Sequence, residues 1–552
     1  MKWEVPVIKG IKNKYEKSIW NLDIGEWSDG INVTFTPDGV RTYFGFKQLL
    51  PDYTFPEQIL WISTINEDIL FFGCRNVYWS QNGATPQLTN WINIDPKATY
   101  WSECETPNWV LFTNGIERPK YWDTAAKQFV ELTDAPTARL FWYQDRHLLA
   151  TAITGAYNKI QWSDLDDPTN WSSGEAGYGY FDLGSTDIPL CIANISGNFY
   201  IIANRGVWLI RYVGYPIYWE VRPVFVGLGI ISSKCISEFG DESLFIGNDM
   251  FYFCDGYNLK PIENGITRQF FLEVDPNHLE KIFSIFDEYQ RHVLIFYNKN
   301  GAETVDTWHA NTDYNINDLV IPSYDKGLYY RCIQAGTSGD SEPTWPHEYH
   351  ATVEDGTVIW RCEGALEYTD KAILYNYDLG YWNGLDLGQI QAAGFWRVAE
   401  NILIDDFDFL IDEWNSLIDA KNFTFNFPTL IFVKNDGKLY QLDYNKVVDK
   451  ESYLITGYIP LEERKLTKLR KYIISILIQG QGETNVYVGT IESINATPIW
   501  HGPYKYTFQK DEKIELADYD LNARYIVLKF QNVNKFFEIY GYVIEYEEVG
   551  EE

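Results

Sequence analysis

The feature that most constrains the fold is a pair of apolar strands joined by a polar turn, which recurs along the first half of the chain. Each unit is an apolar run, a turn with Asn, Asp or Gly, and a second aromatic run, a pattern typical of a β-hairpin. Successive units begin 38 to 52 residues apart, at Ile69, Trp109, His147, Phe199, Leu244 and His292. A propeller blade takes about 40 to 50 residues. The spacing therefore predicts an all-β chain folded as a β-propeller of six to eight blades, and disfavours the alternative of serial β-sandwiches.

The regular spacing breaks once, and the break defines an inserted segment. A strand that ends near Gly301 resumes its pattern only at Ala372, and removing residues 302–367 joins the two into one hairpin. The removed segment holds two similar strands, at 327–336 and 356–365. Insertion at a hairpin tip is tolerated because the chain ends stay close together. We therefore expect a small β insert domain in one blade.

The rest of the chain divides by composition. From about residue 461 long aliphatic and aromatic strands predict a C-terminal β-sandwich-like domain. A heptad-like acidic stretch at 404–420 fits either a short helix or a loop, and we favour the loop. The predicted organisation is an N-terminal segment that joins the propeller (1–46), the propeller (47–301 and 368–447), the insert (302–367) and the C-terminal β domain (448–552).

The chain is strongly acidic. It has 77 acidic against 45 basic residues and a net charge of −32, so its surface as a whole repels nucleic acid. Such a surface suits either an ordinary soluble acidic protein or the wall of a conduit through which DNA slides without sticking.

No apolar run approaches about 18 residues, so we expect no membrane insertion. We also expect no signal peptide at the start of the chain. The seven scattered cysteines indicate reduced thiols rather than a disulfide framework.

Catalytic signals are weak. The chain lacks GxSxG, the phosphate-binding GxxxxGK[ST], HExxH and the EF-hand pattern. A group of histidines and cysteines in the insert has no standard zinc spacing: His309, His347, His350, Cys332 and Cys362. We therefore expect no enzyme activity, no catalytic residues, no metal and no cofactor.

The insert is dense in large rings. Five of them lie within about fifty residues: Trp308, Tyr314, Tyr330, Trp345 and Trp360. Exposed rings can stack on the apolar faces of sugars, whereas a domain this small also needs rings for its core. We assign Trp308 and Trp360 to the core. Trp345, in a Pro-Thr-Trp-Pro loop, is the best candidate for an exposed ring, so the carbohydrate-binding candidates are Trp345, Tyr314 and Tyr330.

A basic cluster stands out against the acidic background. It contains Arg464, Lys465, Lys468, Arg470 and Lys471. These cations suit contact with DNA phosphates or with an acidic partner subunit. Alternatively, the cluster is a solvated strand edge that its lysines keep from aggregating. We favour this strand edge or the subunit contact over a contact with DNA.

The insert resembles a small module of phage tail and virion proteins, which is itself similar to chitin-binding carbohydrate modules. The matching elements are Trp308, Tyr314, Asn-Asp-Leu-Val at 317–320, Tyr-Arg-Cys at 330–332, AGTSG at 335–339, SEPTWP at 341–346 and DGTVIW at 355–360. The resemblance covers about 65 residues and implies a carbohydrate-binding-like module.

The flanking chain resembles the tail nozzle proteins of short-tailed phages, also described as tail hub or packaged-DNA stabilisation proteins. The matching stretches are GEWSDGINVTFTPDGVRTYFGF at 25–46, QWSDLDDPTNW at 161–171, GVWLIRYVG at 206–214, FIGNDMFYFCDGYNLKPI at 245–262 and the C-terminal RYIVLKF with FEIYGYVIEYEEVG. The resemblance implies a homo-oligomeric ring, commonly of six, below the head-to-tail adaptor. It implies partners in the adaptor, in tail fibres or spikes, and in DNA that passes without sequence specificity.

The expected function is accordingly that of a structural virion protein. It would be assembled in the host cytoplasm, retain the packaged genome, and pass it during ejection. The alternative is a tail adhesin or glycan-degrading enzyme that recognises host surface polysaccharide. A cytosolic propeller scaffold without a virus connection is the third reading.

Overall fold

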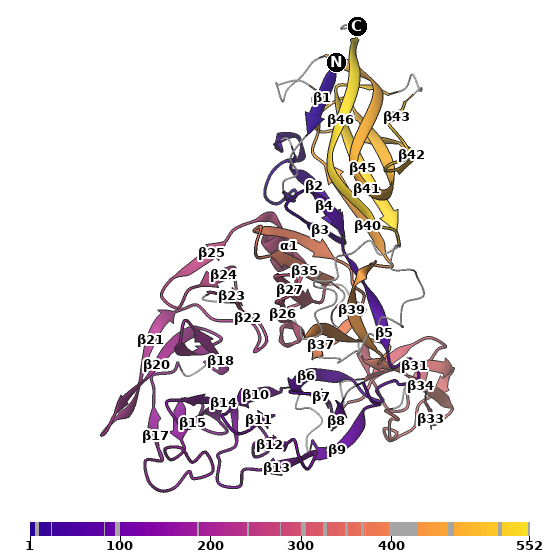
Figure 1. The fold of residues 1–552 in the computed structure, drawn as a ribbon. Helices are drawn as coiled ribbons and strands as arrows, with labels where there is room; N and C mark the ends of the chain where they lie inside the picture. The colour runs from indigo at the N-terminus through magenta and orange to yellow at the C-terminus, as the bar shows by residue number, and fades with distance from the viewer. Residues whose placement is uncertain are drawn as a thin grey trace, which may run out of the picture.

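A computed structural model shows a β-propeller, a stalk built from both ends of the chain, and a small inserted sheet (Figure 1). The structure describes residues 1–5, 10–23, 25–81, 83–93, 100–184, 187–239, 242–276, 278–299, 305–323, 328–347, 351–365, 369, 371–396, 428–461, 469–516 and 521–549. The acidic repeat at 404–420 lies outside these residues.

Seven four-stranded units of the described chain form the propeller, which confirms the predicted fold class. Five are built from consecutive strands. The first blade has β6 (Ile59–Ile65), β7 (Asp68–Gly73), β8 (Asn76–Gln81) and β9 (Gln87–Ile92), and the second has β10 (Ser102–Glu105), β11 (Val110–Thr113), β12 (Lys120–Asp123) and β13 (Gln128–Glu131). The third has β14 (Ala138–Gln144), β15 (His147–Ile153), β16 (Lys159–Trp162) and β17 (Gly177–Tyr180), the fourth has β18 (Pro189–Ile195), β19 (Asn198–Ala203), β20 (Gly206–Gly214) and β21 (Tyr218–Val226), and the fifth has β22 (Ile236–Phe239), β23 (Glu242–Ile246), β24 (Phe251–Cys254) and β25 (Leu259–Ile262). The sixth is β26 (Phe283–Asp287), β27 (His292–Tyr297), β35 (Lys371–Asn376), β36 (Tyr381–Leu385), and the seventh is β37 (Ile390–Trp396), β38 (Thr429–Lys434), β39 (Leu439–Val447), β5 (Phe44–Leu49).

The apolar runs that recur in the sequence are the second strands of the blades. All six residues of β7 and of β27 are buried, because these strands lie between neighbouring sheets with both faces covered. The outermost strand β9 has mostly exposed residues instead. Each recurring unit therefore marks the middle of a blade rather than its beginning.

The ring of blades closes with a strand from the N-terminal region. β5 pairs antiparallel with β39 and completes the seventh blade. A Cβ on Gly45 would lie 2.3 Å from the carbonyl oxygen of Val447, so only glycine permits this close backbone approach. Chain closure therefore links the beginning of the propeller to its end.

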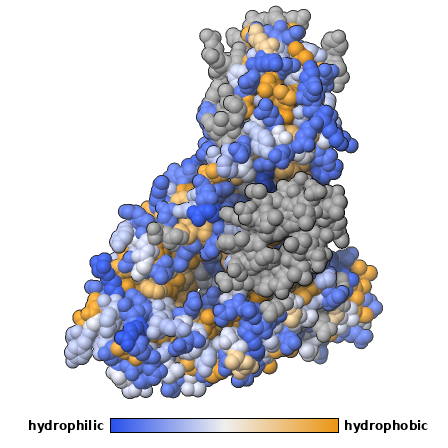
Figure 2. All heavy atoms as spheres, viewed as in Figure 1, coloured by the Kyte–Doolittle hydropathy of each residue, from blue (hydrophilic) through white to orange (hydrophobic). Residues whose placement is uncertain are grey.

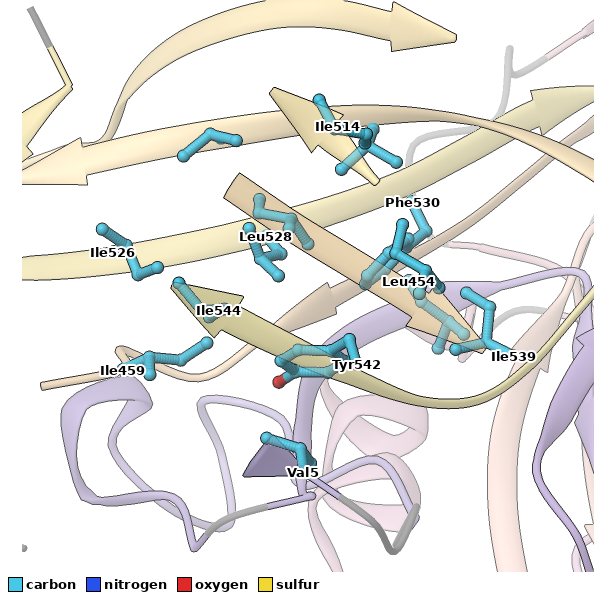
Figure 3. Close-up of a cluster of buried hydrophobic side chains, with 14 of the residues drawn as sticks. Val5, Leu454, Ile459, Ile514, Ile526, Leu528, Phe530, Ile539, Tyr542 and Ile544 are labelled. Carbon is cyan, nitrogen blue, oxygen red and sulfur yellow. The ribbon is translucent and has the colours of Figure 1, made fainter. Parts of the chain in front are cut away.

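The stalk is a β-sandwich-like domain that combines strands from both chain termini. Its strands are β1 (Lys2–Val5), β2 (Trp27–Ile31), β3 (Val33–Phe35), β4 (Val40–Thr42), β40 (Glu451–Thr456), β41 (Arg470–Ile491), β42 (Ile499–Thr507), β43 (Ile514–Glu515), β44 (Asn522–Ala523), β45 (Tyr525–Val533) and β46 (Phe537–Val549). β41 pairs with β46 along its first half and with β45 along its second half, so it belongs to both sheets. Aliphatic and aromatic side chains fill the space between them (Figure 3).

The N-terminal segment departs from the prediction that residues 1–46 join the propeller. It joins the propeller through β5 and through one parallel pairing of β2 with β36 of the sixth blade, whereas β1 and β4 pair with β46, and β2 also pairs with β40. The physical reason is an apolar set on the N-terminal strands, Trp27, Val33, Phe35 and Val40, which is buried in the same core as the C-terminal strands.

A buried polar network joins the stalk to the propeller. The Asn32 side chain donates to the carbonyl oxygen of Glu451 at 2.8 Å and accepts from the amide of Asp386 at 2.7 Å. Nearby, Asn376 donates to the carbonyl oxygen of Phe35 at 3.2 Å. Asn32 has φ of 56°, which Asn tolerates better than most residues. This network fixes how the stalk stands on the sixth blade.

The insert leaves and re-enters the sixth blade at one end of a hairpin. β27 pairs with β35 from His292↔Asn376 to Tyr297↔Lys371, and the chain between them forms the insert. Its strands are β28 (Asp306–Thr307), β29 (Asp313–Tyr314), β30 (Leu319–Ile321), β31 (Leu328–Gln334), β32 (Gly336–Thr337), β33 (Thr352–Asp355) and β34 (Val358–Ala365). Among the described residues the α-helix is α1 (Gly265–Glu273), with 3-10 turns η1 (Ile19–Asn21) and η2 (Leu279–Lys281).

Replacing Asn32 should destabilise the whole molecule. Asn32→Ala leaves two partly buried backbone groups without hydrogen bonds and puts alanine, which tolerates positive φ less well than asparagine, at φ of 56°, so we expect a loss of about 2–4 kcal/mol. Asn32→Gly keeps the conformational freedom and should lose less. Urea denaturation of the three proteins measures the difference. Equal midpoints for the Ala variant and the wild type would contradict the role of the network.

We also expect the stability of the folded chain to depend on pH. Burial lowers the pKa of His292 to about 4, whereas burial raises the pKa of Asp287 to about 6. The unfolded chain therefore takes up the histidine proton first, and the stability that neutral His292 contributes is lost as the pH falls from about 6.5 toward 4. Protonation of Asp287 favours the folded state over the same range and opposes this loss.

Substitution of His292 separates the two effects. Between pH 7.5 and pH 5 the wild type should lose about 2 kcal/mol more than His292→Gln, since only the wild type carries the titrating imidazole. The measurement is urea denaturation of both proteins at the two pH values. Parallel stability curves would show that His292 titrates normally.

Candidate functional site

Side chains from non-adjacent blades meet at the propeller axis. Lys234, just before β22 of the fifth blade, donates from Nζ to the carbonyl oxygen of Leu60 in β6 of the first blade. The same ammonium lies 4.8 Å from the ring centroid of Trp61. Because the first and fifth blades are not neighbours in a ring of seven, this side chain crosses the axis.

A second crossing comes from the segment before β10. The Tyr100 hydroxyl donates to the carbonyl oxygen of Leu190 at 3.4 Å, which joins the second blade to the fourth. The guanidinium of Arg139 lies 5.6 Å from the Tyr100 ring centroid. Lys234 and Tyr100 therefore connect non-adjacent blades near the centre of the ring.

Ionisable groups near the axis have shifted pKa values. Burial lowers the pKa of Lys234 to about 7, and repulsion from Lys281 acts in the same direction. Burial raises the pKa of Glu103, whose carboxylate accepts from Trp61 Nε1 at 3.4 Å. Burial also raises the pKa of Glu238, which accepts from the Asn194 amide. Chemically, this arrangement cross-links the blades through an amine, an indole and carboxyl groups.

The predicted exposure of Trp345 is wrong. Its side chain is 2% exposed, and its ring lies 4.3 Å from Tyr330 and 5.9 Å from Trp360. The indole nitrogen donates to Glu342 at 3.0 Å. A sheet of this size has little else to bury, so the loop folds its tryptophan inward.

The other two carbohydrate candidates also pack within the insert. Tyr330 is fully buried and donates its hydroxyl to the carbonyl oxygen of Pro346 at 2.8 Å. Tyr314 is partly buried and packs edge-on against Trp360, with ring centroids 4.8 Å apart. The structure thus brings all three candidates together, in a core rather than on a platform. The assignment of Trp308 and Trp360 to the core is confirmed.

One buried carboxylate organises this core. Asp355 Oδ2 accepts from the indole nitrogens of Trp308 at 2.7 Å and Trp360 at 2.9 Å. Asp355 Oδ1 accepts from the Gly339 amide at 2.8 Å, which holds the glycine-rich loop against the sheet. Sequence reasoning identified the rings and missed the carboxylate that orients them.

The basic cluster divides into a described and an undescribed part. Arg464, Lys465 and Lys468 lie outside the described residues. Arg470 is exposed and pairs with Glu492 at 3.0 Å. Lys471 is buried and donates to the carbonyl oxygen of Leu469 at 3.3 Å, so it offers no charge to DNA. Successive side chains of a β-strand point to opposite faces of the sheet, so Arg470 and Lys471 of β41 lie on different faces.

Other functional groups can be placed briefly. Among the described residues, no group of three or more His, Cys, Asp or Glu side chains is arranged to hold a metal ion. Cys332 and Cys362 are both buried in the insert. No helix in the described part of the chain is long and apolar enough to cross a membrane.

A projecting hairpin is the surface feature that sequence reasoning missed. β20 and β21 have nine residues each, whereas β24 and β25 of the next blade have four. The pair extends beyond the neighbouring blades at the lower left of Figure 1, and Figure 2 shows hydrophobic residues among hydrophilic ones at that edge. The signal in the sequence is the run RYVGYPIY, which keeps apolar residues where other blades have polar turns.

Comparisons with known proteins find only distant structural likenesses. No protein-family model and no curated protein sequence matches the chain. Among solved structures, BamB from Moraxella catarrhalis is 8% identical over 72% of this chain and 100% of its own, with a TM-score of 0.34. Virginiamycin B lyase from Staphylococcus aureus is 10% identical over 58% and 99%, with a TM-score of 0.32. The computationally designed Ika8 protein is 9% identical over 72% and 98%, with a TM-score of 0.33. Likenesses at this level say nothing about function.

The Asp355 arrangement generates a test of the insert. Asp355→Asn replaces one acceptor oxygen with an NH₂ group that faces N–H donors, so we expect the insert to lose about 2–4 kcal/mol. Hydrogen exchange should accelerate in peptides from 328–347 and 351–363 while propeller peptides stay protected. The neighbouring exposed Glu354→Gln serves as the control. Unchanged exchange in the Asn variant would rule out the organising role.

Proposed function

We propose that the chain is a structural virion protein, the tail nozzle of a short-tailed phage. In this role several copies form a ring, commonly of six, around the DNA channel below the head-to-tail adaptor. The ring retains the packaged genome and passes it during ejection, and it also contacts tail fibres or spikes. The proposed location is the virion tail after assembly in the host cytoplasm, and the role requires no catalysis.

The observation that carries the proposal is where the nozzle-like stretches lie in the fold. The N-terminal stretch 25–46 contains β2, β3, β4 and the beginning of β5, and the C-terminal stretch contains β45 and β46. Although about 500 residues separate them, β4 pairs with β46, and β2 and β45 both pair with β40. The stretches that resemble nozzle proteins therefore meet in one unit, which supports a shared architecture of propeller and stalk.

The charge of the chain fits passage of DNA. A net charge of −32 makes the surface repel phosphates, so a duplex meets little that would hold it. Lys234 and Tyr100 link non-adjacent blades across the centre of the propeller. We therefore place the DNA channel between copies of the chain rather than through one propeller.

The alternative role of adhesin or glycan-degrading enzyme has less support from the site. It relied on an exposed ring at Trp345, which is buried against Tyr330. The insert is better explained as a folded module that the sixth blade carries on a hairpin end. It remains available for contact with other tail proteins through its outer surface.

Cryo-electron microscopy of the native particle tests the proposal. We expect a closed ring of propellers on the tail axis, directly below the adaptor, with DNA density above a constriction. The purified chain should also fail to retard duplex DNA in a gel at low salt, because its charge repels phosphate. Density confined to peripheral fibres, or a chain that is monomeric both in solution and in the particle, would overturn the nozzle role.

A further inference from the structure

The end of the β20–β21 hairpin leaves the hydrophobic core of its blade. The first five residues of β20, Gly206–Ile210, are buried, whereas Arg211, Tyr212 and Val213 are exposed. The strands stay paired to the tip, from Arg211↔Glu220 to Gly214↔Tyr218. The extension is therefore ordered β-structure that turns exposed side chains to solvent.

The tip exposes apolar side chains to an unusual degree. Tyr215 is 85% exposed and Ile217 is 65% exposed, with Val213 beside them. Scattered exposed apolar residues are ordinary, but a group of them on a projection marks a contact surface. Nothing else in the described chain covers these side chains.

The base of the hairpin holds the tip in place. Trp219 is buried, and its ring lies 5.2 Å from that of Tyr212. The buried His147 of the third blade packs against the same two rings, at 5.9 Å and 5.8 Å. A preorganised projection loses little conformational entropy when it binds, so its apolar surface is available for affinity.

The charge of the hairpin points to the kind of partner. Its only charged residues from 206 to 226 are Arg211, Glu220 and Arg222, which leaves one net positive charge in a chain of net charge −32. This segment is therefore attracted electrostatically to the acidic surface of another copy, although two whole copies repel each other. An apolar and weakly basic tip fits an acidic neighbour of the same sequence.

The outer edge of the first blade has the complementary character. Leu88 and Ile92 of β9 are both more than half exposed and lie on one face of the strand. Glu131, at the end of the adjacent β13, is exposed and acidic, and Asn90 of β9 donates to Phe129 of β13 at 2.9 Å. This edge offers apolar side chains next to a carboxylate, as the tip offers apolar side chains next to Arg211.

The two surfaces are placed for head-to-tail assembly. β9 belongs to the first blade and β20–β21 to the fourth, so they lie on nearly opposite sides of a seven-bladed propeller. A contact between two different surfaces is head-to-tail and can continue from copy to copy, whereas a contact of one surface with itself stops at a dimer.

We propose that the β20–β21 tip of each copy docks on the β9–β13 edge of the next copy. Tyr215 and Ile217 pack on Leu88 and Ile92, and Arg211 pairs with Glu131 of the neighbour. The inference rests on the proposed ring and names the surface that forms it.

Tip substitutions test the docking surface. Tyr215→Ser with Ile217→Ser should weaken self-association about 100-fold, the effect expected for two central apolar contacts. Tyr178→Ser with Tyr180→Ser is the matched control, because these rings of β17 are similarly exposed but lie off the hairpin. Light scattering after size exclusion measures the assembly, and thermal melting checks that each variant is folded.

A charge exchange identifies the receiving surface. Arg211→Glu alone should weaken the ring by repulsion from Glu131, and adding Glu131→Arg in the same chain should restore it. A tip variant that still forms the wild-type ring would overturn the docking role of the hairpin. Loss of the ring without rescue by Glu131→Arg would overturn the β9–β13 edge as its receptor. A wild type that is monomeric in solution and in the particle would instead overturn the nozzle role itself.

Discussion

The structure depends on one segment that belongs to two domains at once. Between Trp27 and Leu49 the chain forms β2, β3 and β4 in the stalk and then β5 in the seventh blade. Its turning point carries Asn32, whose side chain bonds both to Glu451 of the stalk and to Asp386 beside the sixth blade. Since β5 also closes the ring of blades, stalk and propeller are expected to stabilise each other.

Aromatic residues serve mainly as internal packing in this chain. In the insert, Trp308, Trp345 and Trp360 share one small core, and Asp355 fixes two of the indoles. The expectation of a sugar platform failed because ring content alone does not distinguish a core from a surface in a domain of this size. Most of the large exposed rings, above all Tyr215, are on the propeller, and Trp500 of β42 is exposed on the stalk.

The propeller combines a fixed centre with a variable periphery. Lys234 and Tyr100 cross the axis, and buried second strands such as β7 and β27 hold the blades together. Function is then left to what departs from the repeat: the insert on the sixth blade, the extended hairpin on the fourth, and the stalk. In the ring that we propose, the extended hairpin is the surface that meets the neighbouring copy.

The sequence by itself determined the elements that arise from local pattern. The spacing of hairpin units predicted the propeller, and the break after Gly301 predicted an insert in one blade, because alternation and turn chemistry are properties of short stretches. Tertiary structure alone decided the contacts between distant residues. It placed β1 to β4 against β46, turned Trp345 inward, buried Lys471 beside the exposed Arg470, and brought Lys234 to Leu60 across the axis. No local pattern encodes these outcomes, since each depends on which surface is available for burial once the blades have closed.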